Sequence, residues 1–354
     1  MKRALELAAK GLGRTGTNPV VGAVIVKNGK VIGQGYHQKQ GGPHAEIEAL
    51  KGLNNRQIQG ATMYVTMEPC VHENKRTPPC TRTLVGSGLK KISVAIRDPN
   101  PMVDGKGIKV LLKSGIAVET GMLEAEARCI NEYYLKSIRT SLPFVTLKMA
   151  QSLDGRIATS CGDSKWISNG EARKFVHKLR GAHGAVMTTS STVIADDPHL
   201  GVRGVKGVDP LRIIMDRKSV LEGGELVFRD GNFMLISEEV MLGAKRKISV
   251  AGGNNHVVYP RETPLKSIFK DLYLKGIGSI MVEAGGRFAA ELVRAGLADK
   301  FLFFIAPVII GGDGLPSVSG LGIKKLDLCK KLGNVEYKFF GDNILVSGYA
   351  VKQA

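Results

Sequence analysis

Three potential zinc ligands and one additional carboxylate stand close together in the first quarter of the chain. His44 is followed two residues later by Glu46, and Cys70 and Cys80 come in the next stretch. A catalytic zinc typically takes three protein ligands and leaves its fourth position to water, and thiolates with an imidazole suit Zn²⁺ better than Mg²⁺ or Ca²⁺. We therefore expect one catalytic zinc ion, bound by His44, Cys70 and Cys80.

Glu46 is positioned to act as the catalytic acid and base beside such a metal. Zinc lowers the pKa of a bound water from about 15.7 toward ~7, which permits attack on an amino-bearing ring carbon at neutral pH. Glu46 can carry the proton to the departing ammonia without occupying the metal, a role worth roughly 10²- to 10⁴-fold in rate. This residue set is typical of a hydrolytic deaminase. The alternatives are a structural zinc, for which only His72 could supply a nearby fourth ligand, or a core histidine beside two unrelated buried thiols.

The spacing of the two cysteines distinguishes this chain from the nucleobase deaminases. Nine residues separate Cys70 from Cys80, whereas the nucleobase deaminase signature has two. The segment 68–80 instead resembles the zinc loop of the bacterial bifunctional riboflavin-biosynthesis enzymes, which join a diaminohydroxyphosphoribosylaminopyrimidine deaminase to a 5-amino-6-(5-phosphoribosylamino)uracil reductase. The segments 18–22, 35–37 and 97–101 extend the resemblance.

The resemblance has two departures and several implications. The family usually has eight residues between the cysteines and a glycine after the loop histidine, whereas this chain has nine and Glu73 there. An extra residue in an exposed loop costs little closure entropy. Between Lys75 and Arg76, we choose Arg76 as the basic position because it directly precedes Thr77. The implied contacts to the deaminase substrate are Asn18, His37, Arg76, Asp98 and Asn100.

A double glycine, Gly285-Gly286, stands between an expected strand and an expected helix in the second half. Free N–H groups at a helix N-terminus can bind phosphate, but the pattern is not the G-x-G-x-x-G fingerprint, and such a pair is often only a turn. The segments 146–155, 162–167, 192–198 and 283–286 resemble, in the same order, the motifs of the family's NADPH-dependent reductase domain, which has a dihydrofolate-reductase-like α/β fold.

The resemblance assigns two groups of residues in this half. Arg180 and Arg203 can bind a substrate phosphate through charge-assisted hydrogen bonds, and Trp166 offers a flat apolar wall, although a single Trp is more often a core residue and a pair of Arg more often a solvated surface. Lys148 is added as an electrostatic or proton-donating group. The implied NADPH contacts are Ala150, Trp166, Thr192, Asp196, Gly285, Gly286, Arg287, Phe288 and Ala289. The implied substrate contacts are Lys148, Ser164, Arg180, Leu200, Arg203 and Glu283.

The elements that must position the zinc ligands follow from the local pattern. Alternating residues around Asn28-Gly29 predict a hairpin, the strongest short-range signal of its kind. Helices are predicted at 44–53, from 80 onward and at 108–113, and strands at 61–66, 92–95 and 116–119. The alternation of strands and helices indicates a three-layer α/β/α domain, with zinc where two helix N-termini converge above strand ends. The resemblance implies that this domain is cytidine-deaminase-like.

The second domain begins after Pro143, so we predict domains at 1–143 and 144–354. A capping box at 168–171 predicts a helix that runs to about residue 181. Strands are predicted at 184–188, 211–216, 233–236, 256–259, 279–283 and 301–306, and a closing hairpin at 335–340 and 344–349.

Length and composition fit a two-domain globular enzyme. The chain has 354 residues, 43% of them hydrophobic, and its longest apolar run, 301–310, is half of what a membrane span needs. No secretory signal is evident, and Cys129, Cys161 and Cys329 have no disulfide pattern, so we expect a cytoplasmic protein with reduced thiols.

The net charge of +18 leaves one alternative open, a nucleic-acid-modifying zinc deaminase with an appended binding domain. The basic residues are spread over both halves without a polybasic run, and only 6% of residues are aromatic, so we expect no nucleic-acid partner and no membrane partner. A protein in which one domain has lost its activity is a further alternative. The expected ligand is a small phosphorylated pyrimidine, and a homodimer is expected by analogy with the family.

Overall fold

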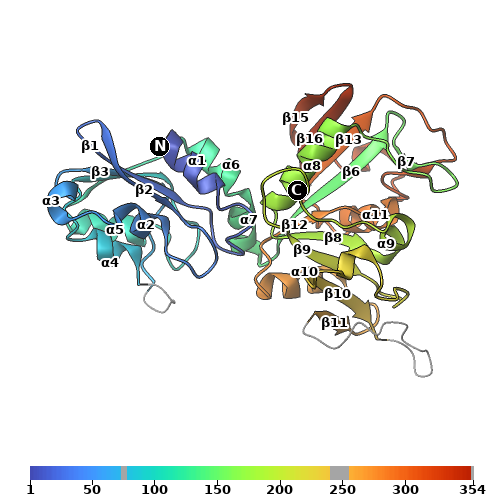
Figure 1. Cartoon of the computed structure of the whole chain (residues 1–354), viewed down its shortest axis with the longest axis horizontal. Coiled ribbons are helices and arrows are strands. Elements are labelled where there is room, and N and C mark those ends of the chain that lie inside the picture. Colours follow the sequence, from blue (N-terminus) through green and yellow to red (C-terminus); the bar gives the residue numbers. More distant parts are fainter. Residues whose placement is uncertain (73–77, 240–254, 352–354) are drawn as a thin grey trace. The chain divides into compact units, whose positions relative to one another are not determined.

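The computed structural model describes residues 1–72, 78–239 and 255–351. The chain divides into two compact units, shown in Figure 1. The first contains Met1–Pro143 with Tyr273–Gly278, and the second contains Phe144–Leu272 with Ser279–Ala354. Each unit has its own sheet and core, and each is described by itself.

The first unit is built on a five-stranded sheet in the order β2-β1-β3-β4-β5. β1 is antiparallel to β2 and β3, and β3, β4 and β5 are parallel. The predicted hairpin is confirmed, because Asn28 and Gly29 form its turn with φ values of 50° and 74°. The strands are β1 (Gly22–Lys27), β2 (Lys30–Tyr36), β3 (Thr62–Met67), β4 (Lys91–Ile96) and β5 (Ala117–Thr120).

Helices cover both faces of this sheet, which confirms the three-layer prediction. One core packs Ala49, Leu84 and Leu111 from the helices on one face against the strands, and another packs Ala127 and Tyr134 on the opposite face. The helix predicted at 44–53 ends earlier, at Leu50, before the turn at Gly52. The helices are α1 (Lys2–Ala9), α2 (Ala45–Leu50), α3 (Asn55–Ile58), α4 (Cys80–Leu84), α5 (Lys106–Lys113), α6 (Glu124–Ile130) and α7 (Glu132–Thr140).

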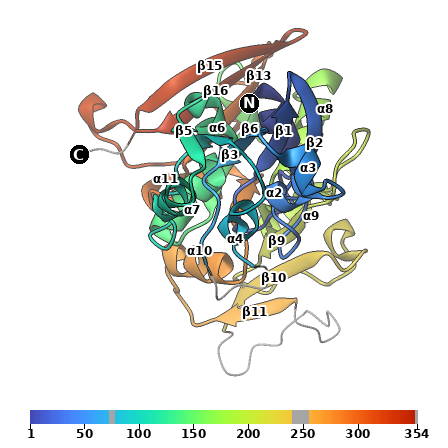
Figure 2. The ribbon, with the colours of Figure 1, turned by 90° about the vertical axis from the view of Figure 1, so that its left-hand side faces the viewer.

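The second unit is built on a nine-stranded sheet in the order β11-β10-β9-β8-β12-β6-β13-β16-β15. In this spatial order, the strands from β11 through β10, β9, β8, β12 and β6 to β13 are parallel. β16 and β15 close the sheet as an antiparallel hairpin. Figure 2 shows β15 and β11 at its opposite edges. The strands are β6 (Phe144–Ser152), β8 (Ala185–Thr189), β9 (Leu211–Met215), β10 (Phe233–Glu238), β11 (His256–Tyr259), β12 (Ser279–Val282), β13 (Lys300–Ala306), β15 (Leu332–Phe340) and β16 (Asn343–Ala350).

The strand order creates a crevice in this sheet. β12 is late in the chain but lies between β8 and β6 in the sheet. The connection after β8 therefore runs toward β9, whereas the connection after the neighbouring β12 runs the other way, toward β13. Ligands of open α/β sheets bind at such a switch point. A small second sheet pairs β7 (Arg156–Ala158) with β14 (Leu315–Pro316) beside the main one.

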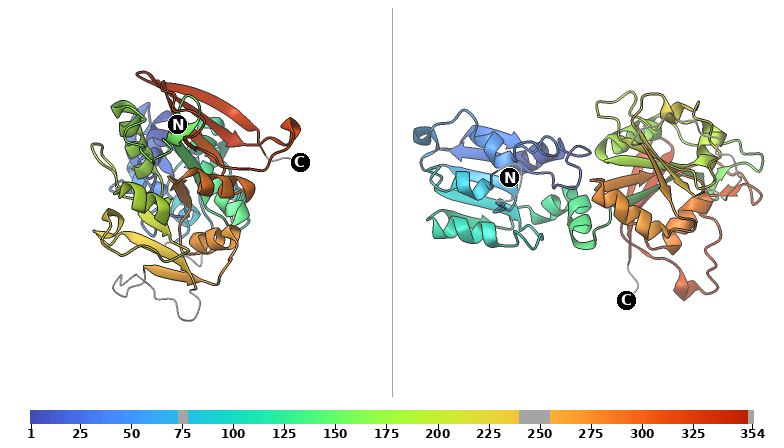
Figure 3. Two further views of the ribbon diagram at one scale, coloured as in Figure 1. Left: turned by 90° about the vertical axis from the view of Figure 1, so that its right-hand side faces the viewer. Right: turned by 90° about the horizontal axis from the view of Figure 1, so that it is seen from below.

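Helices also cover both faces of the second sheet. Figure 3 shows α10 and α11, in orange, on the side opposite to the green and yellow α8 and α9. These helices are α8 (Gly170–Ala182), α9 (Ser190–Asp196), α10 (Leu265–Leu274) and α11 (Gly286–Arg294), and short 3₁₀ turns span Leu226–Phe228 and Leu326–Leu328. Across the described residues, no helix is both long enough and apolar enough to cross a membrane.

The predicted capping box of α8 is wrong by one residue. Asn169, not Ser168, is the N-cap, and its side-chain oxygen accepts a hydrogen bond from the Ala172 N–H at 3.0 Å. The Asn169 amide nitrogen also donates to the Phe340 carbonyl at 2.7 Å, in the closing hairpin. This long-range bond selects Asn169, and local sequence rules do not contain it.

Candidate active sites

The three predicted zinc ligands meet in the first unit. His44 is the N-cap of α2 and Cys80 is the first residue of α4, so two helix N-termini converge as predicted. The His44 Nδ1 atom lies 3.1 Å from the Cys80 sulfur and 3.5 Å from the Cys70 sulfur, and the three donor atoms all lie within 4.8 Å of one another. One imidazole and two sulfurs at this separation suit a single zinc ion.

The two thiols are not equivalent. The Cys80 side chain hydrogen-bonds to Cys70 and, together with His44, lowers the pKa of Cys70 to about 4. The same pairing with Cys70, and then burial, raises the pKa of Cys80. The pairing therefore favours the thiolate on Cys70, and a bound zinc ion would also deprotonate Cys80, because zinc takes cysteine as thiolate.

Glu46 lies in the first turn of α2 and is almost fully buried, with 3% of its surface exposed. Burial raises its pKa, and the nearby His44 opposes that rise. A buried carboxyl with a raised pKa is suited to accept a proton and then donate it. The structure thus places a proton carrier in the same helix turn as the metal ligand.

The loop that follows β4 carries two of the predicted substrate contacts. β4 is parallel to β3, whose end leads to Cys70, so both segments leave the same edge of the sheet. The Asp98 carboxylate accepts hydrogen bonds from the Asn100 N–H at 2.9 Å and the Tyr134 hydroxyl at 2.7 Å. The Asn100 side-chain oxygen accepts one from the Met102 N–H at 3.0 Å. These bonds fix the shape of the loop.

The remaining predicted deaminase residues fall into three cases. His37 is buried, with its ring centroid 5.4 Å from that of His44 and its Nδ1 atom 3.0 Å from the Pro43 carbonyl. Asn18 is half-buried in the turn that precedes β1. Arg76 lies outside the described residues, so its role stays a prediction.

The second unit contains a cavity of about 1330 Å³ at the switch point of its sheet. It is lined by fourteen of the fifteen residues predicted for this half, and Ala289 is instead fully buried in α11. The cavity is large enough for a dinucleotide and a second small molecule, because typical ligand pockets measure about 300–1,000 Å³. The lining residues predicted from sequence are Lys148, Ala150, Ser164, Trp166, Arg180, Thr192, Asp196, Leu200, Arg203, Glu283, Gly285, Gly286, Arg287 and Phe288.

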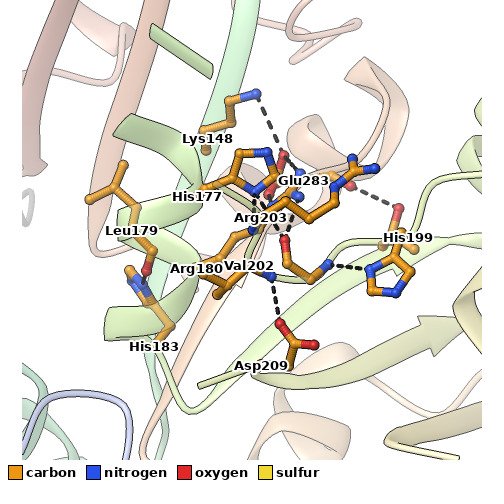
Figure 4. A network of polar contacts seen from close by, with 12 residues as sticks. Lys148, His177, Leu179, Arg180, His183, His199, Val202, Arg203, Asp209 and Glu283 are labelled. Carbon is orange, nitrogen blue, oxygen red and sulfur yellow. Dashed lines mark hydrogen bonds and ion pairs between the residues drawn. The ribbon is translucent and has the colours of Figure 1, made fainter. Parts of the chain in front are cut away.

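Glu283 forms ion pairs with two basic side chains, Arg180 and Lys148, at the cavity wall, as Figure 4 shows. Arg180 donates to its two oxygens at 2.7 and 3.1 Å, and the Lys148 nitrogen lies 3.5 Å away. Burial opposes the charge of Glu283, but Arg180 and Lys148 together lower its pKa to about 2. Burial lowers the pKa of Lys148, and Glu283 partly restores it. The three groups form a charged cluster that faces the cavity.

Arg180 is therefore engaged by the protein rather than free for a ligand. Besides Glu283, its Nη1 group donates to the Gly201 carbonyl at 3.1 Å. Arg203 differs, because its side chain is exposed, lines the cavity and has no polar partner among the described residues. The two arginines predicted as equivalent phosphate contacts thus have different environments.

The start of α11, which also lines the cavity, has backbone features suited to a phosphate group. Gly285 is the N-cap of α11 without any side-chain cap, and a Cβ placed on it would meet no atom within 4 Å. A Cβ on Gly286 would come within 2.1 Å of the Pro316 carbonyl, so the second glycine is needed for packing. The N–H groups of this helix start are therefore open to a phosphate.

Three predicted residues lie around this opening. The Ser164 hydroxyl donates to Asp196 at 3.2 Å and thereby ties the loop after β7 to α9. Trp166 is 70% exposed, with the Arg173 guanidinium 4.6 Å from its ring centroid. This Trp is therefore not a core residue, and its ring is available as a cavity wall.

Sequence reasoning missed several residues that the structure connects to the two sites. The buried Glu68 accepts hydrogen bonds from the Asp98, Gly105 and Ile108 N–H groups at 3.2, 2.9 and 3.2 Å, and so holds the loop after β4 to the end of β3. In the second unit, His177 contacts the loop that carries Arg203. Its position three residues before Arg180 on one helix was the available signal, because such residues share a face.

Comparisons with known proteins agree with this geometry. A family model described as "RibD C-terminal domain" matches residues 143–346, and one described as "Cytidine and deoxycytidylate deaminase zinc-binding region" matches residues 1–96. The chain is similar to the riboflavin biosynthesis protein RibD of Aquifex aeolicus, with 42% identity over 349 residues, which cover 98% of this chain and 96% of that protein.

Two solved structures are similar over nearly the whole chain. A Thermotoga maritima diaminohydroxyphosphoribosylaminopyrimidine deaminase/5-amino-6-(5-phosphoribosylamino)uracil reductase matches with a TM-score of 0.88 and 37% identity, covering 99% of this chain and 97% of that one. The Acinetobacter baumannii RibD matches with a TM-score of 0.87 and 35% identity, covering 99% and 98%.

Proposed function

Because this chain belongs to the RibD family of bifunctional riboflavin-biosynthesis enzymes, we propose that it deaminates and then reduces one phosphoribosylated pyrimidine with two separate sets of residues. The first step converts 2,5-diamino-6-(5-phosphoribosylamino)pyrimidin-4(3H)-one to 5-amino-6-(5-phosphoribosylamino)uracil. The second reduces the ribosyl side chain to ribityl. The observation that carries the proposal is the meeting of His44, Cys70 and Cys80 in one unit and a lined cavity at the switch point of the other.

In the deamination step, His44, Cys70 and Cys80 would hold one zinc ion, which supplies water activated at neutral pH. Water adds at C2 of the pyrimidine and the 2-amino group leaves as ammonia. The Glu46 carboxylate takes the proton from the attacking water and gives it to the departing nitrogen. Its burial suits both roles, because raising the pKa of a carboxyl toward the working pH lets the group both accept and donate a proton.

The same unit would bind the pyrimidine through residues at the sheet edge near the metal ligands. We assign this role to Asn18, His37, Asp98 and Asn100, together with Arg76. The bonds from Tyr134 and Asn100 to Asp98 support it, because they hold the loop in one conformation before substrate arrives.

In the reduction step, NADPH would supply the hydride when bound to the second unit. We assign its phosphates to the open helix start at Gly285 and Gly286, with contacts from Ala150, Trp166, Thr192, Asp196 and the 287–289 segment. Reduction would take place at C1 of the ring-opened ribosyl group, where the oxygen or nitrogen that takes up charge would need a proton. We assign this proton to the Lys148 ammonium, whose pKa is lowered by burial.

The substrate of this step would lie along the charged cluster. We assign its binding to Ser164, Arg180, Leu200, Arg203 and Glu283, with the phosphate on Arg203, because that guanidinium is the less engaged of the two. Arg180 would then act chiefly by holding Glu283 toward the ribosyl hydroxyls. A carboxylate fixed by a bidentate arginine is a well-oriented acceptor.

We assign the deaminase to residues 1–143 and the reductase to residues 144–354. We also propose a homodimer formed through the reductase unit, because the edge strand β15 exposes Tyr337 and Phe339, each 68% accessible. Sedimentation velocity would test it. The five cysteines form no disulfide with one another, which supports a cytoplasmic location, where cysteines stay reduced.

The experiment that tests the proposed function follows NADPH absorbance with the purified protein and each of the two substrates. Decay with both the diaminopyrimidine and the deaminated uracil derivative is the expected result. Decay with the uracil derivative alone would contradict a working zinc site, and decay with neither would contradict the assignment. Among residues 1–72, 78–239 and 255–351, no observation favours the nucleic-acid alternative.

A further inference from the structure

We propose that His177 is a positioning residue that places Arg203 for the phosphate of the reductase substrate. The inference deepens the proposed function and rests on it. It concerns the loop that joins α9 to β9, which Figure 4 shows beside α8, with His177, His199, Val202, Arg203 and Asp209 drawn.

The Arg203 side chain is suited to a ligand anion. It is exposed, lines the cavity, and has no hydrogen bond or ion pair within the parts of the chain that are described. Arg180, on the facing helix, instead has three donor bonds to Glu283 and to the Gly201 carbonyl. A phosphate entering this end of the cavity therefore meets one guanidinium that is already bound and one that is available.

His177 contacts the backbone of this loop on both sides of Val202. Its Nδ1 atom lies 3.0 Å from the Gly201 carbonyl oxygen and 3.3 Å from the backbone nitrogen of Arg203. One ring nitrogen cannot donate to a carbonyl and accept from an N–H at once. The shorter contact identifies Nδ1–H as the donor to the Gly201 carbonyl, whose second lone pair accepts from Arg180 at 3.1 Å. His177 therefore fixes the carbonyl group two residues before Arg203.

A neutral ring is also what the surroundings favour. Burial lowers the pKa of His177, and the positive charges of Arg180 and Arg203 lower it further, while the Gly201 carbonyl and Glu283 oppose the shift. The ring is therefore neutral at neutral pH, and its single proton serves the bond to the Gly201 carbonyl.

The loop just before Arg203 has little freedom. Leu200 is buried in the left-handed region with φ of 57°, and the Val202 N–H donates to Asp209 at 2.6 Å. A Cβ on Gly201 would come within 2.6 Å of the His199 ring. The bond from His177 to the Gly201 carbonyl adds a further constraint two residues before Arg203.

The experiment compares the Michaelis constants of the reductase for 5-amino-6-(5-phosphoribosylamino)uracil and for the same compound without its phosphate. Arg203→Ala should raise KM for the phosphorylated compound about 10- to 100-fold, as expected for a charge-assisted bond, and leave the other KM unchanged. His177→Ala should give the same selective effect at about 3- to 10-fold, because it removes one neutral hydrogen bond. The two changes together should cost no more than Arg203→Ala alone.

Two further substitutions test the atom responsible. His177→Asn places its amide nitrogen near the position of Nδ1, where it can donate to the Gly201 carbonyl, and should restore most of the affinity for the phosphorylated compound. His177→Gln carries its amide farther out and should behave like His177→Ala. The matched control is Lys206→Ala, which removes a positive charge from an exposed residue of the same loop that does not line the cavity; it should change neither KM.

The outcomes separate this inference from the assignment beneath it. If Arg203→Ala affects both compounds equally, the phosphate is not bound there and both ideas are wrong. If Arg203→Ala is selective but His177→Ala is not, or if their effects add fully, only the positioning role is wrong. If His177→Ala does not fold, His177→Asn and His177→Gln decide, and equal KM values for these two would overturn the proposal.

Discussion

In the first unit the reactive groups come from one short stretch between His44 and Cys80, whereas the cavity of the second unit is lined by residues from Lys148 to Gly320. The first site is compact, with soft donors that a single metal can bind, and its carboxyl Glu46 is buried. The second is a wide cavity in which charge is spread over Lys148, Arg180 and Glu283. The first therefore depends on a few atoms, and the second distributes binding among many groups.

This difference predicts that the largest effects of single substitutions fall in the first unit. Glu46→Gln should lower ammonia release by roughly 10²- to 10⁴-fold, because the amide cannot carry the proton. Reduction of the deaminated substrate should be unchanged. Ammonia release and NADPH oxidation measured on the same preparation check both statements. Glu48→Gln, two residues later in α2, is the matched control, and an equal loss from it would contradict the role of Glu46.

Removing a ligand should separate the two units in the same way. Cys70→Ser should abolish stoichiometric zinc binding, because the remaining His44 and Cys80 leave a catalytic site one ligand short. Metal analysis together with the two activities checks it, with zinc and deamination lost and reduction retained. Cys129→Ser, at an exposed thiol far from the cluster in sequence, should retain zinc. Full zinc occupancy in Cys70→Ser would contradict the three-ligand site.

In the second unit the strongest single effect should come from Glu283. Glu283→Gln leaves Lys148 and Arg180 charged and mostly buried without their carboxylate, which costs about 3–5 kcal/mol when a buried pair is broken. Urea unfolding of this unit measures the loss. A loss of unfolding free energy below about 1 kcal/mol would contradict this prediction, because it would show that water already screens the charges of Lys148, Arg180 and Glu283.

The same carboxylate predicts an acid sensitivity. The pKa of Glu283 is about 2 in the folded chain against an ordinary 4.5, so its charge stabilises the fold above pH 4.5. That contribution, about 3 kcal/mol, should be lost as pH falls from about 4.5 toward 2. Urea midpoints of the second unit between pH 7 and 3 check it. In Glu283→Gln this part of the pH dependence should disappear.

The smallest expected effect compares the two adjacent glycines. Gly285→Ala places its Cβ in open space at φ of −69°, so stability should hold while NADPH affinity falls about tenfold by steric interference with a phosphate. Gly286→Ala should instead destabilise the unit, because its Cβ would meet the Pro316 carbonyl at 2.1 Å. Calorimetric binding and thermal melting of both variants separate the two roles. Unchanged NADPH affinity in Gly285→Ala would contradict the assigned phosphate position.

The contrast between a compact site and a distributed one also explains how much of each site the sequence could predict. The zinc ligands could be predicted because their chemistry and spacing are local, and the Asn28-Gly29 hairpin could be predicted because its turn needs two residues with positive φ. The lining of the second cavity came from motif resemblance. Its electrostatics did not, because Arg180 and Glu283 are far apart in sequence and only the fold brings them together. The N-cap of α8 was misplaced for the same reason, since Asn169 is selected by a bond to Phe340.

The most direct test of two separate residue sets is complementation between two defective chains. One chain carries Glu46→Gln and the other Lys148→Met, and each is first shown to retain its remaining activity. Mixed with the diaminopyrimidine substrate and NADPH, the two should restore NADPH oxidation that neither supports alone, because the deaminated product of one chain is the substrate of the other. If NADPH oxidation is not restored although each chain keeps its own partial activity, the claim of two separate sets of residues is contradicted.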